Sequence, residues 1–349
     1  MLKRAPKRNV ALRVLGLYVV LAFANVLYAQ QLPDEVSGIT RQGELLYLVD
    51  DAIPGTAITY PAASSSSLIE FDDMSKMQFL KASNTDFVVD LEAVGFMADG
   101  RLVALSERLR QIVDLRKGVA IASLPEWMSE FGNRGLEGMA IKAIVSGSRV
   151  AVLYEGGYTE AQDAPLWLSA SQSNRPMVPF IVTFDVPNHG AVGYVDKQPT
   201  DARLLNLGRV HQRFIDPELK NEKEPYAQRF RAPGLVWHEK GDSAFIVLLS
   251  SENRPVTPVS GAPCKSGERN SRRFSFKVLQ RFTADGQPVG DAIDLDSLVQ
   301  VQNGGLAGPC VTNWEGIGWY EPGSQLIVVN DRYPGRTAGV IVDLPESWR

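Results

Sequence analysis

The sequence has little of the material from which the best-marked catalytic sites are built. It contains two cysteines and three histidines in 349 residues, and their scattered positions give no zinc-ligand spacing. It has no Gly-x-Ser-x-Gly elbow, phosphate-binding P-loop, dinucleotide-binding glycine motif or EF-hand loop. These absences exclude the most recognisable enzyme classes and leave the carboxylates as candidate functional groups.

The sequence also lacks an uninterrupted apolar run of the roughly 20 residues that a membrane-spanning helix needs. The longest candidate, Val14–Ala24, follows five basic residues, and residues 1–29 contain no acid. This pattern predicts a secretory signal peptide over residues 1–29, cleaved near Ala29, with an uncleaved anchor as the alternative. The mature part, residues 30–349, is therefore predicted to be exported to the periplasm or secreted, without a membrane span.

Basic charge is scarce in this mature part. The whole chain has a net charge of −4, of which the first 29 residues contribute five positive charges and no negative one. An acidic mature chain argues against nucleic acid as a partner, because such binding needs clustered basic residues.

The two cysteines, Cys264 and Cys310, lie in Gly/Pro-rich segments. In an exported protein they favour a disulfide over two free thiols.

Long amphipathic helical patterns are absent, and short apolar runs bounded by Gly, Asp and Pro take their place. Examples are residues 101–105, 244–249 and 325–329. Such runs predict an all-β protein. Pro125–Phe131 is the one segment for which a single helical turn is expected.

A short motif recurs along the chain, at the start of an apolar strand that is followed by a turn and a second strand. Its five copies are Ser37-Gly38-Ile39, Glu92-Ala93-Val94, Glu137-Gly138-Met139, Pro233-Gly234-Leu235 and Glu315-Gly316-Ile317. Repeated units of about four short strands predict a β-propeller, since one blade cannot bury both of its faces alone.

Five motif-bearing blades are counted, and the length of residues 156–232 leaves a sixth, degenerate blade as an alternative. The last unit lacks an outer strand after Val340–Leu344. We expect the segment Gln31–Glu35 to supply that strand and close the ring.

The residues around three of the motifs resemble the phytase-like domain family, also described as having "esterase-like activity of phytase". The resemblance rests on Asp90-Leu91-Glu92-Ala93-Val94 with Ala104–Arg108, on Asn133–Ala140, and on Asn313–Ile317. It covers roughly residues 33–344 and extends to the related SdiA-regulated propellers. It implies an exported β-propeller that binds calcium and has a hydrolase activity.

The repeated acids are the candidate functional residues. Because the first strand of a propeller blade lies nearest the axis, Glu92, Glu137 and Glu315 are expected to meet around the channel. Carboxylates gathered there repel one another unless a cation or backbone N–H groups compensate them. The functional interpretation is a Ca²⁺ site; the structural alternative is that each Glu bonds to the backbone of the next blade as a latch.

Further acids and arginines follow the second strands of the units. Glu155 and Asp331 are added as candidate metal ligands, and Glu107 joins Glu92, Glu137 and Glu315 as a candidate catalytic group. Three arginines, Arg108, Arg254 and Arg332, are candidates for holding an anionic substrate, with ion pairs to neighbouring acids as the alternative.

The predicted function is metal-assisted hydrolysis of a phosphate or carboxylic ester, with an anionic small molecule as the partner. The alternative is a non-enzymatic propeller that binds a ligand or a protein, because a fold alone does not fix a function. His238 is expected to have a structural role. The aromatic residues Trp237, Trp314, Trp319 and Tyr320 are expected to pack within the blades, with a platform for a sugar or a base as the alternative.

Overall fold

The chain divides into two units, Met1–Leu32 and Pro33–Arg349, and every element below belongs to the second. The computed structural model describes residues 32–33, 35–51, 53–62, 68–81, 89–129, 135–155, 179–207, 229–252, 274–295, 298, 314–330 and 337–349. Among these residues, no helix is long and apolar enough to cross a membrane. Cys264, Cys310 and residues 1–29 lie outside the described part, so the disulfide and the signal peptide stay predictions.

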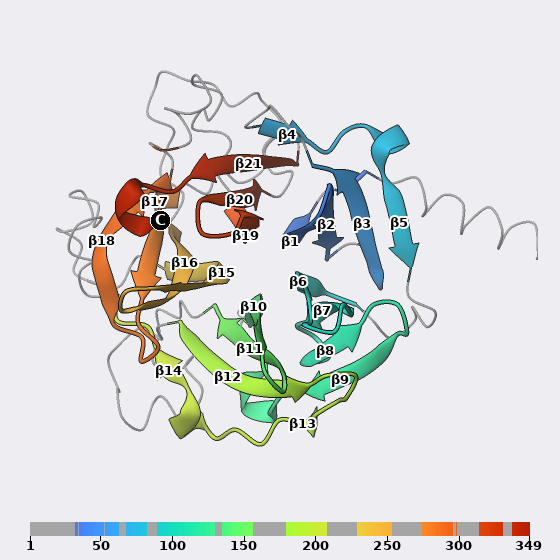
Figure 1. The fold of residues 1–349 in the computed structure, drawn as a ribbon, viewed down its shortest axis with the longest axis horizontal. Helices are drawn as coiled ribbons and strands as arrows, with labels where there is room; N and C mark the ends of the chain where they lie inside the picture. The colour runs from blue at the N-terminus through green and yellow to red at the C-terminus, as the bar shows by residue number, and fades with distance from the viewer. Residues whose placement is uncertain are drawn as a thin grey trace, which may run out of the picture. The chain divides into compact units, whose positions relative to one another are not determined.

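The described strands form five antiparallel sheets arranged as the blades of a propeller (Figure 1). The first blade comprises, from the axis outward, β1 (Val36–Gln42), β2 (Leu45–Asp50), β3 (Thr56–Pro61) and β5 (Gln78–Lys81). The second comprises β6 (Leu91–Phe96), β7 (Leu102–Ser106), β8 (Gln111–Asp114), β9 (Val119–Ser123) and a short parallel strand, β13 (Gly193–Tyr194).

The other three blades follow the same order. The third comprises β10 (Leu136–Ile144), β11 (Gly147–Tyr154), β12 (Phe180–Pro187) and β14 (Arg203–Leu204). The fourth comprises β15 (Arg229–Lys240), β16 (Ser243–Glu252), β17 (Phe274–Phe282) and β18 (Pro288–Asp294). The fifth comprises β19 (Trp314–Glu321), β20 (Gln325–Asn330), β21 (Ala338–Asp343) and β4 (Leu68–Glu70).

Among the described residues, four short 3₁₀ turns accompany the strands: η1 (Met74–Lys76), η3 (Glu126–Met128), η5 (Pro199–Asp201) and η7 (Glu346–Trp348). The second of them is the helical turn expected in Pro125–Phe131. The prediction of a five-bladed all-β propeller is confirmed. The described part of residues 156–232 adds strands to the second, third and fourth blades and forms no sixth one.

The ring closes differently from the prediction. The outer strand of the fifth blade is β4, which pairs with β21 through Glu70 opposite Ala338 and Ile69 opposite Gly339. This strand comes from the connection between β3 and β5 of the first blade, so the expectation that Gln31–Glu35 would close the ring is wrong. The blade is completed by a three-residue strand, which is too short to stand out in a hydropathy pattern.

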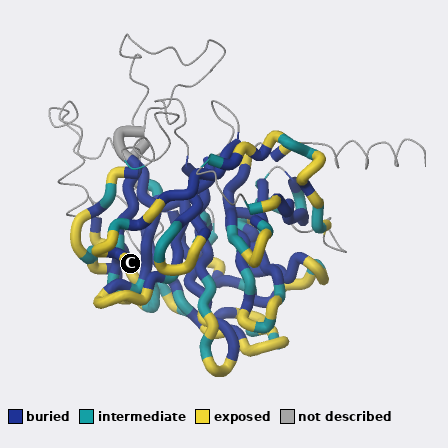
Figure 2. The backbone as a smooth tube through the Cα atoms, turned by 45° about the horizontal axis from the view of Figure 1, so that its top comes forward, coloured by how far each residue is buried: buried dark blue, intermediate teal, exposed yellow. Residues whose placement is uncertain are grey.

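In the described part of the chain the core consists of five apolar clusters, each between two adjacent blades. Strand β7 shows how this arises, because side chains alternate between the two faces of a strand. Leu102 and Ala104 pack towards the first blade, whereas Val103 and Leu105 pack towards the third. Middle strands are therefore buried on both faces, which explains their continuous apolar runs. In Figure 2 the buried positions follow the strands and the exposed ones gather at the turns.

A buried ion pair fastens the second blade to the third. Asp99, whose side chain is 2% exposed, accepts hydrogen bonds from the Arg101 guanidinium and the His189 N–H. Arg101 also donates to the carbonyl oxygen of Gly190. Burial raises the pKa of Asp99, but these hydrogen bonds outweigh it and lower the pKa from 3.8 to about 2.

Asp99→Asn is expected to lower the free energy of unfolding by about 1–2 kcal/mol at neutral pH. The folded-state pKa is below the unfolded one, so the contribution of Asp99 is complete above about pH 4 and is lost as the pH falls towards 2. Urea unfolding of wild type and variant across this range measures the difference, with the exposed Asp242→Asn as control. A difference that does not change between pH 7 and pH 3 would contradict the assignment.

Candidate functional site

Every blade has a β-bulge near the start of its innermost strand. The pairing of first and second strands skips one residue between Val36 and Gly38, Leu91 and Ala93, Leu136 and Gly138, and Trp314 and Gly316. The bulged residues are the motif residues Ser37, Glu92, Glu137 and Glu315. In the fourth blade the irregularity covers Ala232 and Pro233, between Arg231 and Gly234. Bulges re-aim side chains, and these occur at the repeated motif in all five blades.

The glycine after the bulge is required by the close approach of the inner strands. A Cβ on Gly38 would lie 2.6 Å from the Cα atom of Ala93, and a Cβ on Gly316 would lie 2.7 Å from the carbonyl oxygen of Ser37. The pairs Glu137-Gly138 and Glu315-Gly316 therefore combine an inward-turned acid with tight packing between blades. Ser37, Glu92, Glu137 and Pro233 line a narrow neck of the channel, with a volume of about 10 Å³.

Three acids surround the guanidinium of Arg231. Its Nη2 atom lies 3.4 Å from Glu315 Oε2 and 3.9 Å from Glu137 Oε1, and its Nε atom donates to Glu155. Burial lowers the pKa of Arg231, but the three carboxylates outweigh it and raise this pKa well above its ordinary value. Burial, with Glu155 and Glu92 nearby, also raises the pKa of Glu137 despite Arg231.

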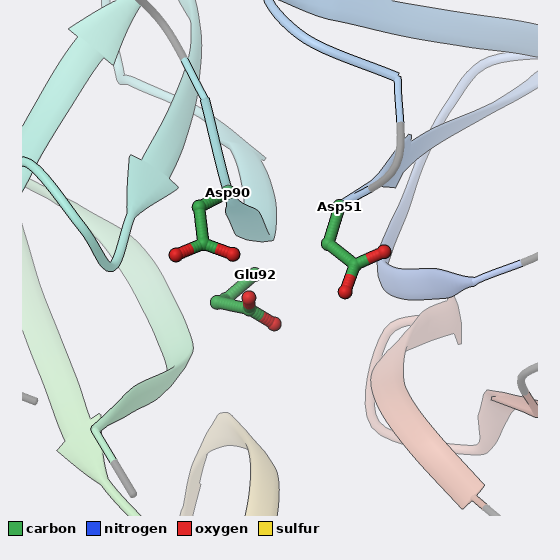
Figure 3. Close-up of side chains that lie close together, drawn as sticks. All are labelled: Asp51, Asp90 and Glu92. Atoms are coloured by element: carbon green, nitrogen blue, oxygen red, sulfur yellow. The ribbon is translucent and has the colours of Figure 1, made fainter. Parts of the chain in front are cut away.

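A second group of acids lies between the first and second blades (Figure 3). It consists of Asp51, which follows β2, Asp90, which precedes β6, and Glu92 in the bulge of β6. One carboxylate oxygen from each lies within 4.8 Å of the other two. Asp90 has a φ of 61°, in the left-handed region, and its carbonyl oxygen accepts a hydrogen bond from the Glu107 N–H.

This second group contains several acids and few positive charges that could balance them. Burial, then a side-chain hydrogen bond with Glu35 and the charges of Glu35, Asp50 and Asp90, raises the pKa of Asp51 from 3.8 to about 8. Burial, then Glu107, Asp51, Asp90 and Glu315, raises the pKa of Glu92 well above its ordinary value. The pKa of Asp90 is raised by burial, while Arg108 acts in the opposite direction.

The described residues leave some of these oxygens without partners. Glu92 is 7% exposed, and no described residue forms a hydrogen bond or ion pair with its side chain. The buried Oδ1 atom of Asp51 has no hydrogen-bond partner among them either. Buried carboxylate oxygens without hydrogen-bond partners among the described residues are suitable ligands for a hard divalent cation, because Ca²⁺ takes six to eight oxygen ligands in flexible geometry.

The structure thus brings Glu92, Glu137 and Glu315 to one end of the channel, as expected, but divides them between two groups. Glu155 lies with Arg231, whereas Glu107, in the turn between β7 and β8, contributes charge to both groups. Arg108 is exposed beside Asp90. Whether these residues bind metal or substrate stays a prediction. Asp331, Arg254 and Arg332 lie outside the described residues.

Sequence reasoning did not select Asp51, Asp90 or Arg231 as site residues. A signal existed for each of them. Asp51 belongs to the acidic ends of second strands, and Asp90 directly precedes the Leu91-Glu92 pair. Arg231 lies in the one repeat whose bulge carries proline instead of an acid or a serine.

The opposite end of the channel has a different character. A cavity of about 450 Å³ is lined there by Trp237, Trp319 and Tyr320, among others. Arg41 is paired with Glu321 and lies over the Tyr320 ring, and Lys142 is paired with Glu239 and lies over the Trp237 ring. These two cations are already neutralised and stacked, so this end is aromatic and close to neutral.

His238 has the expected structural position. It is 4% exposed, and its ring nitrogens lie 3.0 Å from Ser243 Oγ and 2.8 Å from the carbonyl oxygen of Trp348. The contact fastens the C-terminal turn η7 to the fourth blade.

The sequence matches no family model and no curated protein. Among solved structures, the chain is similar to the calcium-binding protein regucalcin from Agrobacterium tumefaciens (9% identity, TM-score 0.38, 90% of this chain and 92% of that one). It is also similar to a luciferin-regenerating enzyme (11% identity, TM-score 0.38, 90% of this chain and 94% of that one). A third similar structure is the β-propeller domain of Cps50 (Swd1) from Myceliophteria thermophila (11% identity, TM-score 0.28, 90% of this chain and 100% of that one). Similarity at this level assigns neither a family nor an activity to the chain.

Proposed function

We propose that this protein is a calcium-dependent hydrolase of carboxylic or phosphate esters, with the ion held by Asp51, Asp90 and Glu92. The observation that carries the proposal is the convergence of these three carboxylates within 4.8 Å of one another. Without a cation, three carboxylates at this separation in a partly buried site repel one another when ionised, and burial raises the pKa of each. An ion with oxygen ligands removes that conflict.

The chain's own residues then have separate tasks. A bound divalent ion lowers the pKa of a coordinated water and neutralises charge that develops on an ester oxygen. Asp51, Asp90 and Glu92 hold the ion, and the exposed Arg108 beside them attracts the anionic part of a substrate. Glu107 lies close enough to Glu92 to raise its pKa, so it is the candidate to accept a proton from the attacking water.

The Glu-bearing motifs support a place for the chain in the phytase-like group, and this place is part of the proposal. Export is proposed on the basic and apolar pattern of residues 1–29, and N-terminal sequencing of the mature protein would test it.

A non-enzymatic binding propeller is the second candidate. The cavity of about 450 Å³ at the opposite mouth favours it, because that volume suits a small ligand.

The deciding experiment assays the purified protein against a panel of phosphate and carboxylic esters, with calcium and with a chelator. We expect turnover with calcium, its loss on chelation and its recovery when calcium returns. Asp90→Asn should lower kcat/KM at least about 100-fold, whereas the exposed Arg203→Gln should leave it unchanged. Calcium binding without turnover of any ester would support the binding propeller and contradict the hydrolase.

A further inference from the structure

We infer that the acidic end of the channel has two compartments, and that Arg231 permanently fills one of them. The inner compartment consists of Glu137, Glu155 and Glu315 around the guanidinium. The outer compartment consists of Asp51, Asp90 and Glu92, and it alone takes a metal ion. The inference rests on the proposed function in one respect, namely that calcium binds at this end.

Arg231 reaches its position because the fourth blade departs from the repeat. Its bulge carries Ala232 and Pro233 where three other blades place a glutamate, so the fourth blade contributes no acid at this level. The guanidinium instead contacts Glu137 and Glu155 of the third blade and Glu315 of the fifth. One side chain therefore joins three blades.

Burial shows that Arg231 belongs to the interior and is not a mobile surface arginine. Its side chain is 17% exposed, and those of Glu137, Glu155 and Glu315 are 12%, 0% and 12% exposed. A divalent ion placed among these acids would lie beside a fixed positive charge in a poorly solvated site, where like charges repel strongly. The guanidinium therefore excludes an ion from the inner compartment.

The outer compartment has no equivalent cation among the described residues. Arg108 is the described basic residue that acts on it, and its side chain is exposed. Glu92, nine-tenths buried, points into this group without a hydrogen bond from any described residue (Figure 3). The two compartments thus differ in whether the protein supplies the cation itself.

The division into two compartments limits the number of metal ions at the acidic end of the channel to one. Two-metal sites hold their ions about 3.5–4 Å apart and clamp both oxygens of a phosphoryl transfer. Here the guanidinium of Arg231 occupies the inner compartment, where a second ion would need its ligands. The acidic end of the channel therefore supports hydrolysis with one ion, and Arg231 is a positioning residue that sets the number of ions.

Calcium titration of the metal-free full-length protein by isothermal calorimetry tests the inference. Wild type should bind one equivalent at this end. Arg231→Met should bind a second equivalent, and Arg231→Lys, which keeps the charge, should bind one. Arg41→Met is the matched control, because Arg41 also pairs with a glutamate but lies at the opposite mouth of the channel. The Arg41→Met protein should bind one equivalent of calcium.

A second comparison covers the case in which Arg231→Met does not fold, as judged by circular dichroism. Glu155→Gln, in the inner compartment, should change calcium affinity by less than about tenfold, whereas Asp90→Asn should lower it at least about 100-fold. Two equivalents in wild type, one in a folded Arg231→Met protein, or equal losses in Glu155→Gln and Asp90→Asn would each overturn the two-compartment arrangement. Wild type that binds no calcium would instead refute the proposed function.

Discussion

Glu92→Gln is expected to abolish tight calcium binding and, at the same time, to stabilise the calcium-free protein. Glu92 is 7% exposed, and burial together with the neighbouring carboxyl groups of Glu107, Asp51, Asp90 and Glu315 raises its pKa. Replacing the carboxylate by an amide removes one ion ligand, so calcium affinity should fall at least about 100-fold. It also removes a buried carboxyl group that repels its acidic neighbours when ionised, so the melting temperature in chelator should rise by about 2–4 °C at pH 8.

Thermal unfolding in chelator and in excess calcium measures both effects. Wild type should gain stability from calcium, by about 2.7 kcal/mol at a free concentration one hundred times Kd, and Glu92→Gln should gain almost none. The exposed Glu44→Gln serves as control and should behave as wild type. The opposite result, a lower melting temperature in chelator with calcium affinity intact, would show that Glu92 is a structural latch between blades.

The architecture could be predicted from the sequence because the physical pattern that builds a blade is repeated. A middle strand buried on both faces needs a continuous apolar run, as in Leu102–Ser106, and the close approach of inner strands needs small residues such as Gly38 and Gly316. Both requirements leave a regular trace in the sequence. The equivalence of Glu92, Glu137 and Glu315 follows from that regularity, which is why their convergence was predictable.

The partners of these acids could not be predicted, because they do not follow the repeat. Arg231 enters the acid cluster from the one blade that lacks an acid or serine in its bulge, and its contacts span 76 and 84 residues of sequence to Glu155 and Glu315. Asp51 and Asp90 come together because the first and second blades are adjacent. Repetition therefore predicts positions, whereas the pairing of charges depends on exceptions to the repetition.

Strand β4, which closes the ring, is also an exception to the repeat, and this is why the expectation about ring closure was wrong. A substitution in this strand should have a large effect on stability. Ile69→Ala in β4 is expected to lower the free energy of unfolding by about 2–5 kcal/mol. Ile69 is 4% exposed and packs with Phe71 and Ile341 in the cluster between the fifth and first blades. It also lies opposite Gly339 in the pairing that closes the ring, so losing its packing weakens both blades. Urea unfolding monitored by tryptophan fluorescence measures the change.

Two further variants serve as controls for Ile69→Ala. Deleting residues 1–31 should change the free energy of unfolding by less than about 0.5 kcal/mol, because no strand of the ring begins before Val36 among the described residues. Val119→Ala, at a position 51% exposed in an outer strand of the second blade, should have an equally small effect. If either control destabilised the protein as much as Ile69→Ala, the loss could not be assigned to the closure of the ring. If neither does, the loss belongs to the three-residue strand that the first blade contributes to the fifth.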